Sequence, residues 1–370
     1  MDQLNDINPV ERFLVDKANM KRVPISVTFE LTPYCNLHCD MCYIRMGKKQ
    51  IEDNGGLMQL EDWIRIAEEL KKMGTLFILL TGGEPMSYPY FKELYLRLRQ
   101  MGFIITINTN ATLLTNEIAQ LFYEHKPRRV NVTLYGSSNE TYWQLCHVKQ
   151  GYDRCMEGLE RLKQYGIDAR LNLTVLKKNQ ADYPELVATA DRLGLSSLDN
   201  CYMSVFCRTN CSTQLDIPSL RMSPEDVAAV ELSHKRHVKG KDFKQYLLDT
   251  EKLIQTGESL VPYGIGLTCR AGKSSCWINW QGMMTPCVDM EEPGISLREY
   301  AVGEAWAYLV DQCNVLPYHQ ECSGCKLKAI CDVCYANASN EKKCGGSVNY
   351  LCEIARAKHK QIQTILKELE

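Results

Sequence analysis

The chain has 370 residues, of which 45% are hydrophobic, and its 43 basic and 45 acidic residues give a formal net charge of −2. A chain of this length and composition buries a sizeable core and is expected to form two or three domains. The near-neutral charge excludes a global basic field that would attract nucleic acid or an anionic membrane, so neither is predicted as a partner.

The first 22 residues are predicted to be an N-terminal extension. They are charged throughout and lack an apolar signal core, and no apolar run in the chain approaches membrane-spanning length. We therefore expect a cytoplasmic protein. Because cytosolic reductants keep thiols from pairing as structural disulfides, the 18 cysteines indicate metal binding or catalysis.

Residues 23 to about 207 repeat one pattern, in which a short apolar or β-branched run precedes a segment of helical period. The strand-like runs are 23–32, 76–83, 103–110, 128–136, 168–176 and 198–206. The helical segments between them are 61–74, 88–102, 115–126, 153–166 and 181–194. Six such units predict an α/β core domain over 23–210, a parallel sheet curled into a partial (β/α)6 barrel of the TIM type. Periodicity alone does not separate this barrel from a doubly wound sheet.

The pattern loosens after this core. We interpret 211–264 as a linker with helices near 224–236 and 242–256, the first of them capped by Ser223. Residues 265–370 have weak strand signals and crowded cysteines, as expected of a domain in which metal supplies the order that a hydrophobic core gives elsewhere. The chain closes with an amphipathic helix predicted over 351–370.

The segment ELTPYCNLHCDMCYIRM (30–46) follows the first predicted strand and carries Cys35, Cys39 and Cys42 in the spacing C-x3-C-x2-C. Three close thiolates fit an iron–sulfur cluster better than a structural zinc ion, which needs four ligands. A cluster with three protein ligands keeps one iron open. A zinc loop that borrows a distant fourth ligand is the alternative.

This pattern, with Met41 as the apolar residue before the last cysteine, resembles the signature of the radical S-adenosylmethionine (SAM) superfamily. The resemblance implies that Cys35, Cys39 and Cys42 hold a [4Fe–4S] cluster whose open iron chelates SAM. It also implies that the reduced cluster cleaves SAM to a 5′-deoxyadenosyl radical, which abstracts hydrogen from a substrate. A flavodoxin- or ferredoxin-like protein is the expected electron donor.

The stretch LLTGGEP (79–85) ends the second predicted strand with two glycines and an acid. Glycines allow the backbone to approach a ligand closely, and a carboxylate accepts hydrogen bonds from an amino group. The stretch resembles the GGE motif of the superfamily, which implies that Gly82, Gly83 and Glu84 hold the methionyl amino group of SAM. Asn110 and Ser137 end the next two strands and are candidates for ribose or carboxylate contacts, although turn formation explains them equally well.

Eight cysteines of the C-terminal part match the stoichiometry of two fully ligated four-cysteine clusters. Their order resembles the SPASM extension of radical SAM enzymes, which implies two auxiliary [4Fe–4S] clusters. The resemblance assigns to the inner cluster Cys269, Cys276, Cys287 and Cys334. It assigns to the outer cluster Cys322, Cys325, Cys331 and Cys352. Two residues separate Cys331 from Cys334 where the extension usually has three, so Cys344 remains a second candidate for the inner ligand; zinc ribbons are the alternative for the whole set.

The remaining cysteines fall into two groups. Three are interpreted as small buried hydrophobic residues: Cys146, Cys155 and Cys313. Three others cluster at the end of the last predicted strand, where they would face the barrel cavity: Cys201, Cys207 and Cys211. Core thiols, a redox pair and a substrate-side thiol all remain open for this second group.

The SPASM resemblance implies a peptide or protein substrate, and the leading hypothesis is maturation of a ribosomally made peptide by a crosslink, a thioether or epimerisation. A sulfatase-maturase-like or small-molecule oxidoreductase, and a non-enzymatic metal-binding module, are the alternatives. Sulfatase-maturing enzymes carry an Asp that acts as a base directly after the cysteine equivalent to Cys287. This chain has Val288 at that position and Asp289 at the next. Asp289 is therefore the candidate catalytic base. The 22 residues before the first strand are too few for a peptide-recognition domain, so a separate leader-recognition protein or residues 211–264 would be needed.

Overall fold

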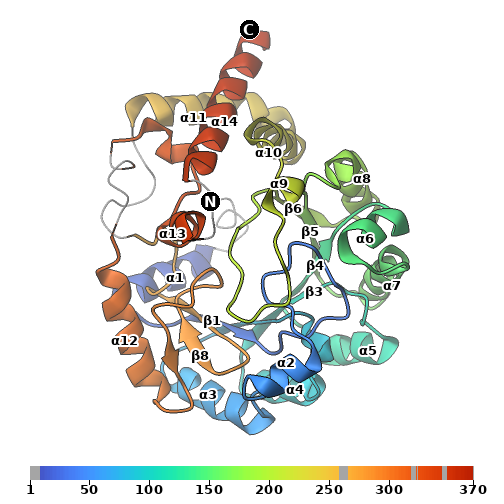
Figure 1. Ribbon diagram of the computed structural model, residues 1–370, viewed down its shortest axis with the longest axis vertical. Coiled ribbons are helices and arrows are strands. Elements are labelled where there is room, and N and C mark those ends of the chain that lie inside the picture. Colours follow the sequence, from blue (N-terminus) through green and yellow to red (C-terminus); the bar gives the residue numbers. More distant parts are fainter. Residues whose placement is uncertain (1–8, 258–265, 318–321, 323, 344–347, 370) are drawn as a thin grey trace.

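The computed structural model describes residues 9–257, 266–317, 322, 324–343 and 348–369 (Figure 1). Its nine strands form one sheet in the order β6-β5-β4-β3-β2-β1-β7-β8-β9. The strands are β1 Ser26–Glu30, β2 Phe77–Thr81, β3 Ile104–Thr109, β4 Arg129–Leu134, β5 Ala169–Thr174, β6 Ser196–Asn200, β7 Ser275–Ile278, β8 Met283–Thr285 and β9 Ile295–Ser296. Pairing is parallel from β6 through β1 to β7, and antiparallel between β7, β8 and β9.

The helices alternate with the strands in the first half of the chain and dominate the second half. The α-helices are α1 Pro9–Lys21, α2 Lys48–Asp53, α3 Leu60–Lys72, α4 Phe91–Gln100, α5 Asn116–Glu124, α6 Asn139–Cys146, α7 Gly151–Gln164, α8 Tyr183–Leu193, α9 Ile217–Leu220, α10 Pro224–Lys239, α11 Phe243–Thr256, α12 Val302–Asn314, α13 Tyr335–Lys343 and α14 Val348–Glu368. Short 3-10 helices are η2 Pro85–Ser87, η3 Gln180–Asp182, η4 Gly240–Asp242 and η6 Lys326–Ile330. None of the helices in the described ranges is both long and apolar enough to cross a membrane.

The sheet is curled, and the helices that connect its parallel strands lie along its outer side (Figure 1). The edges of the sheet, β6 and β9, are not paired with each other, so the barrel stays open. The predicted α/β class with a parallel, partial barrel is confirmed. This arrangement brings the C-terminal ends of β1, β2 and β3 together, because neighbouring parallel strands end on the same side of a sheet.

Helix α3 shows why these segments form helices and where they pack. Its buried side chains recur at helical spacing and include Trp63, Ile66 and Leu70, while Glu61 and Lys72 complement the helix dipole at opposite ends. Trp63 packs against the ring of Phe29 from β1, with the ring centroids 4.7 Å apart. The apolar face of the helix thereby covers the outer face of the sheet.

The other face of the sheet is polar because alternate strand residues point to opposite sides. In β4 the buried Val130 and Val132 alternate with Asn131, whose side-chain amide donates to Asn108 of β3 at 2.8 Å. In β1, Glu30 follows the fully buried Phe29. The inner face of the barrel therefore carries the hydrogen-bonding groups that a ligand would meet.

The prediction for the last strand is wrong in its bounds. A strand was expected over 198–206, whereas β6 covers Ser196–Asn200. The chain beyond it packs its apolar side chains into the core, including Met203 and Val205, and the Met203 carbonyl accepts hydrogen bonds from Arg221 instead of from a strand. The segment therefore leaves the sheet and crosses the open mouth of the barrel.

Strands β7, β8 and β9 at one end of the sheet were not predicted. Strand β7 extends the parallel sheet beside β1, and Cys276 stands opposite Val27. Strands β7, β8 and β9 have four, three and two residues, which is too short for the alternation of apolar residues to be read from sequence. The linker helices begin at Pro224 and Phe243, close to their expected positions, and the terminal helix begins at Val348.

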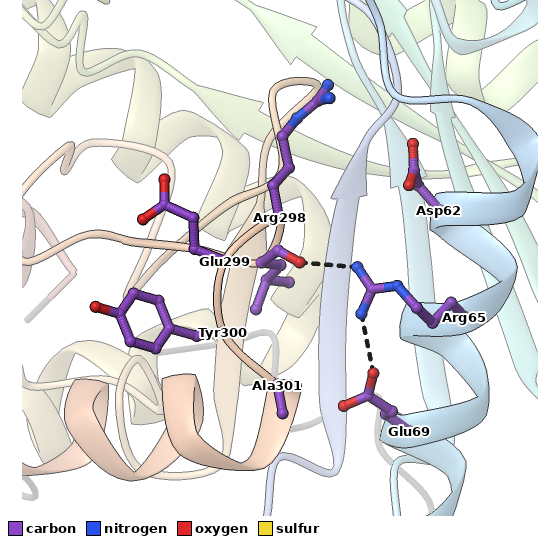
Figure 2. A pocket seen from close by; sticks show the side chains of 8 residues that line it. Asp62, Arg65, Glu69, Arg298, Glu299, Tyr300 and Ala301 are labelled. Carbon is purple, nitrogen blue, oxygen red and sulfur yellow. Dashed lines mark hydrogen bonds and ion pairs between the residues drawn. The ribbon is translucent and has the colours of Figure 1, made fainter.

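A seam joins α3 to the segment that follows β9 (Figure 2). Arg65 donates to the Leu297 carbonyl at 2.8 Å and to Glu69 at 3.0 Å, and Glu69 accepts from the backbone N–H of Val302 at the start of α12 at 2.8 Å. A cavity of about 490 Å³ lies beside these contacts. The barrel and the C-terminal part are thus connected by polar contacts as well as by the continuous sheet.

Candidate functional site

The three cysteines of the C-x3-C-x2-C segment lie in the loop that follows β1. Cys39 is buried, and Cys35 and Cys42 are half-buried. Helix α6 holds this loop in place. The backbone N–H groups of His38 and Asp40 donate to carbonyls at the C-terminal end of the helix at 2.9 and 3.0 Å. The predicted ligand loop is therefore held in place by a helix that sequence analysis did not anticipate.

The environment of the three thiols suits thiolates that bind a cationic cluster. Burial raises the pKa of Cys35 above its ordinary value, and the charges of Glu84, Cys39 and Cys42 raise it further. Burial and the neighbouring Cys39 raise the pKa of Cys42 to about 12. Since Cys39 and Cys42 oppose the ionisation of Cys35, and Cys39 opposes that of Cys42, a metal centre between them would supply the compensating positive charge. The backbone N–H of Leu37 also donates to the Cys35 sulfur at 3.4 Å, the kind of contact that stabilises cluster-bound thiolate.

The two glycines after β2 lie against the backbone of the cysteine loop. A Cβ atom at Gly82 would stand 2.5 Å from the Thr32 carbonyl oxygen, and one at Gly83 would collide with the Tyr34 carbonyl. The backbone N–H of Gly83 donates to Thr32 at 2.7 Å, and that of Glu84 donates to Tyr34 at 3.0 Å. Only glycine fits this approach of two loops, as the sequence predicts.

The Glu84 carboxylate is turned into the protein and is fully buried. It accepts from the Thr109 hydroxyl at 2.8 Å, from the Asn110 backbone at 2.9 Å and from the Met86 backbone at 3.2 Å. Burial raises the pKa of Glu84 to about 7, and these donors oppose the shift. Glu84 therefore ties β2 to β3. Among the described residues, no backbone N–H group donates to the carbonyl groups of Gly82 and Gly83.

Asn110 lies at the cysteine loop, whereas Ser137 lies at α6. The Asn110 side-chain amide donates to the Cys35 sulfur at 3.6 Å and to the Asn36 side chain at 3.1 Å. The backbone N–H of Ser137 donates to Asp182 at 2.7 Å. Thus Asn110 joins the predicted cluster loop, and Ser137 belongs to the adjacent strand end.

A buried ion pair that was not predicted spans the barrel mouth. Arg208 donates to Glu30 at 3.1 Å, and the indole N–H of Trp277 from β7 donates to the same oxygen at 2.9 Å. Burial raises the pKa of Glu30, and the charge of Arg208 opposes this. Within the described residues, the other Glu30 oxygen and the Nε and Nη1 atoms of Arg208 have no hydrogen-bond partner. An acid at a strand end was the only available sequence signal, because Arg208 lies 178 positions from Glu30.

Asp289, the candidate base, lies between the cysteine loop and the C-terminal cysteines. Its carboxylate accepts from the Ser204 hydroxyl at 3.3 Å, and burial raises its pKa. Burial raises the pKa of Tyr43, which follows Cys42, and that of Cys287, and the charge of Asp289 adds to both shifts. Asp289 is thus near both groups of predicted ligands.

The inner set of C-terminal cysteines is partly assembled. The charges of Cys269 and Cys334 raise the pKa of Cys287, after the larger effect of burial. Burial and then Cys269 raise the pKa of Cys334 to about 11. Cys276 lies on β7 in the hydrophobic core, where burial alone raises its pKa. The competing candidate Cys344 lies outside the described residues.

The outer set lies at η6 and α14. The backbone N–H of Cys325 donates to the Cys322 carbonyl at 3.3 Å. Burial raises the pKa of Cys331 to about 11, and the charge of Cys352 contributes to this shift. Cys322 and Cys331 pack against one apolar cluster that includes Leu351. These sequence-distant cysteines therefore lie in one region of the fold.

No three His, Cys, Asp or Glu side chains in the described ranges converge closely enough to hold a single metal ion. The ligands of a four-iron cluster bind different irons, so their sulfurs stand apart and need no such convergence. The donor set of the loop after β1 consists of sulfur alone. Soft thiolate ligands of this kind select iron–sulfur clusters, zinc or copper(I).

A family model described as the radical SAM superfamily matches residues 29–190. Residues 29–190 form a radical SAM domain. The matched range contains the cysteine loop, the double-glycine turn and β1 to β5. A radical SAM domain uses a [4Fe–4S] cluster and SAM, and its presence makes the chain an enzyme.

The similarity to curated relatives extends beyond the radical SAM domain. The AdoMet-dependent heme synthase of Oleidesulfovibrio alaskensis is 22% identical over 327 residues, covering 82% of this chain and 83% of the relative. The antilisterial bacteriocin subtilosin biosynthesis protein AlbA of Bacillus subtilis is 21% identical over 343 residues, covering 88% of this chain and 70% of the relative. The similarity to these two relatives therefore includes most of the chain.

Among solved structures, Streptococcus suis SuiB has a TM-score of 0.67 at 19% identity, covering 94% of this chain and 83% of SuiB. SuiB has also been solved with S-adenosylmethionine and with its precursor peptide SuiA. At this identity the likeness shows the fold. The radical SAM domain and the parts that follow it thus share one architecture with SuiB.

Proposed function

We propose that this enzyme reductively cleaves SAM and uses the resulting 5′-deoxyadenosyl radical to abstract hydrogen from a ribosomally made peptide. The observation that carries the radical chemistry is the meeting of the three-cysteine loop, the double-glycine turn and Asn110 at the ends of β1, β2 and β3. The peptide substrate is supported by the likeness to AlbA, a bacteriocin biosynthesis protein, and to SuiB, which has been solved with its precursor peptide SuiA. The product would carry a crosslink, a thioether or an inverted residue.

Cys35, Cys39 and Cys42 would hold the catalytic cluster. When bound, the reduced cluster supplies the electron that breaks a carbon–sulfur bond of SAM. The carbonyl groups of Gly82 and Gly83 would accept from the methionyl amino group, because the Glu84 carboxylate is already engaged by Thr109, Asn110 and Met86. Glu84 would then act by fixing the turn, and Asn110 by donating to the Cys35 sulfur. Ser137 is retained as a candidate contact of SAM.

The C-terminal cysteines would hold two auxiliary clusters in the interleaved sets predicted from the sequence. The inner set is supported because the charges of Cys269 and Cys334 add to the raised pKa of Cys287, and that of Cys269 adds to the raised pKa of Cys334. The outer set is supported because the charge of Cys352 adds to the raised pKa of Cys331. This proposal includes a core domain at 23–210, a linker at 211–264 and a SPASM domain at 265–370.

Asp289 would act as the base that takes a proton from the substrate after hydrogen abstraction, and the electron left on the substrate would pass to an auxiliary cluster held by the C-terminal cysteines. Its position near Tyr43 and Cys287 supports this role, because that region lies between the two predicted groups of cluster ligands. The Ser204 hydroxyl orients one carboxylate oxygen. The proton would be held at the other oxygen until product leaves.

A flavodoxin- or ferredoxin-like electron donor would approach the face at which Cys39 borders a cavity of about 350 Å³. His38, Arg45 and His147 line this cavity, and Lys178 lies beside it through an ion pair with Asp40 at 2.6 Å. Arg45 and Lys178 outnumber the carboxylate of Asp40 at this rim, so it suits the acidic surface of an electron carrier. A separate protein would recognise the leader segment of the peptide.

The direct test of the substrate class is a mass-spectrometric assay of the reconstituted, reduced enzyme with SAM. Precursor peptides encoded beside the gene are expected to lose two hydrogens, or to exchange a Cα hydrogen, with matching formation of 5′-deoxyadenosine. Deuterium placed on the reacting carbon should appear in the 5′-deoxyadenosine. No change in any precursor peptide, together with oxidation of a sulfatase peptide, would move the assignment to the sulfatase-maturase-like alternative.

The heme synthase relative favours a second candidate, a small-molecule oxidoreductase that acts on a tetrapyrrole. It is distinguished in the same assay by supplying a tetrapyrrole precursor of heme in place of the peptide. Conversion of the tetrapyrrole, with the peptides unchanged, would support this candidate.

Replacement of Gly83 by Ala is expected to lower SAM affinity at least tenfold. The added Cβ would collide with the Tyr34 carbonyl, so the glycine turn must move away from the cysteine loop. Iron content should stay at the wild-type level because no thiol is changed. Equilibrium binding of SAM to the reconstituted protein measures the effect.

Gly303→Ala is the matched control for this replacement. Gly303 lies in α12, its added Cβ meets no atom within 4 Å, and alanine favours a helix by about 0.5–1 kcal/mol. SAM affinity should be unchanged in this variant. Equal SAM affinities of the Gly83→Ala and Gly303→Ala proteins would argue against the assigned role of the turn.

Replacement of Cys287 or Cys352 by Ala is expected to remove up to about four irons per chain without abolishing SAM cleavage. Each variant leaves the loop after β1 intact, so the catalytic cluster should still form. Iron analysis and the yield of 5′-deoxyadenosine are measured on the same sample. Full iron content in both variants would contradict the auxiliary-cluster assignment.

A further inference from the structure

Cys207 and Cys211 form a thiol pair that neither the catalytic nor the auxiliary ligand sets include. Both thiols contact the backbone of Thr213: the Cys207 thiol donates to the Thr213 carbonyl at 3.7 Å, and the Thr213 N–H donates to the Cys211 sulfur at 3.4 Å. Cys201, which was grouped with them by sequence, is instead buried beside Asp199, with its sulfur 3.8 Å from a carboxylate oxygen. The structure therefore separates the three cysteines into one core thiol and one pair.

The pair differs in exposure from the other cysteines outside the ligand sets that the structure describes. Four such cysteines are buried: Cys146, Cys155, Cys201 and Cys313. Cys207 and Cys211 are both only half-buried. The residues after Cys211, Ser212 and Thr213, line the cavity of about 350 Å³ that opens at the cysteine loop. A small reagent entering that cavity would therefore come close to the pair.

A turn between the two cysteines brings both thiols to Thr213. The N–H of Cys211 donates to the Arg208 carbonyl at 3.0 Å, closing a turn, and Asn210 has a φ of 68°, which asparagine adopts more readily than most residues. The turn folds position 211 back toward position 207. Two thiols that contact one residue can approach disulfide geometry by rotation of their side chains and a small backbone adjustment.

The pair also lies against the loop that carries the catalytic ligands. The Cys211 thiol donates to the Cys42 carbonyl at 3.5 Å, while the backbone N–H groups of Arg208 and Ser212 donate to Tyr43 at 2.9 Å and Arg45 at 2.8 Å. A disulfide has no S–H group, so oxidation of the pair would remove the hydrogen bond to Cys42. The backbone bonds on both sides would persist.

We propose that Cys207 and Cys211 are a redox-active dithiol that exchanges with small-molecule disulfides. One thiolate attacks a disulfide RSSR, releasing one RSH and forming a mixed disulfide; the second thiolate attacks the protein sulfur of that intermediate and releases the second RSH. The pair loses two electrons and two protons, and RSSR gains them. This site is additional to the proposed function and does not depend on the auxiliary clusters.

The test equilibrates the reconstituted holoenzyme, without oxygen, in mixtures of reduced and oxidised dithiothreitol of decreasing reducing power. Free thiols are then blocked with N-ethylmaleimide in acid-quenched, denatured samples, and the peptides are mapped by mass spectrometry. As oxidised dithiothreitol increases, the peptide with Cys207 and Cys211 should lose both labels and two hydrogens. Excess reduced dithiothreitol should restore both labels.

Two controls separate this site from general thiol oxidation and from failure of the proposed function. In Cys207→Ser protein Cys211 should keep its label at every ratio, and in wild-type protein Cys155 should keep its label throughout. Iron content and 5′-deoxyadenosine formation are recorded for the fully reduced sample, so a chain without radical SAM activity is recognised independently. Labels retained on both Cys207 and Cys211 in iron-loaded chains at every ratio would overturn the proposal, as would pairing of Cys211 with Cys42.

Discussion

Replacing Cys35, Cys39 and Cys42 together by Ala is expected to reduce 5′-deoxyadenosine formation to that of an enzyme-free control. The three thiols are the proposed protein ligands of the catalytic cluster, and no other sulfur in the radical SAM domain is assigned to that role. Iron content should fall by about four per chain, the content of one cluster. Anaerobic reconstitution, dithionite reduction and chromatographic measurement of 5′-deoxyadenosine give both readouts.

Cys155→Ala is the control for this loss, because Cys155 is a fully buried thiol of α7 that is outside every assigned ligand set. It should retain wild-type iron and SAM cleavage after correction for any unfolded fraction. SAM cleavage that persists in the triple variant would show that the loop after β1 does not hold the catalytic cluster.

Removal of the Glu341 carboxylate in Glu341→Ala is expected to lower the free energy of unfolding by about 3–5 kcal/mol. Glu341 is fully buried, accepts from both terminal nitrogens of Arg221 and accepts from the Tyr202 hydroxyl at 2.9 Å. Arg221 also lies over the Tyr350 ring at 4.2 Å. Without the carboxylate, a buried guanidinium would lose its counter-charge where α13 and α14 meet the chain after β6.

The double variant Arg221→Met/Glu341→Leu isolates this charge effect. Replacing both buried charges by apolar side chains of similar volume often costs little. The double variant should therefore be more stable than Glu341→Ala, although it carries more changes. Guanidinium chloride unfolding under anaerobic conditions measures both proteins. A loss below about 0.5 kcal/mol in Glu341→Ala, the size of an ordinary surface substitution, would contradict a stabilising role for the pair.

The features that were predictable from the sequence are those whose residues are close together along the chain. The spacing of Cys35, Cys39 and Cys42 and the double glycine at Gly82 are local patterns, and each retains its meaning without knowledge of the fold. The core strands were predicted because each contains a short apolar or β-branched run that a helical segment follows. Helix α6 was missed although Ser138 caps it, because eight residues give a weak helical period.

The features that sequence analysis missed depend on contacts between distant positions. Glu84 was expected to offer its carboxylate to a ligand, but the donors of β3 that engage it become apparent only when β2 and β3 are paired. The Glu30–Arg208 pair forms only because the segment after β6 reaches the end of β1. The separation of Cys201 from Cys207 and Cys211 follows from the end of β6 at Asn200, which no local signal in the apolar run 201–206 indicated.

The most direct test of the central claim is the content of iron, sulfide and zinc in the anaerobically reconstituted wild-type protein, with an assay of SAM cleavage on the same sample. About twelve irons per chain, as three four-iron clusters require, and dithionite-dependent formation of 5′-deoxyadenosine are the expected results. Zinc without iron, and SAM left intact, would contradict the account, because the cysteine loop and the C-terminal cysteines would then be structural.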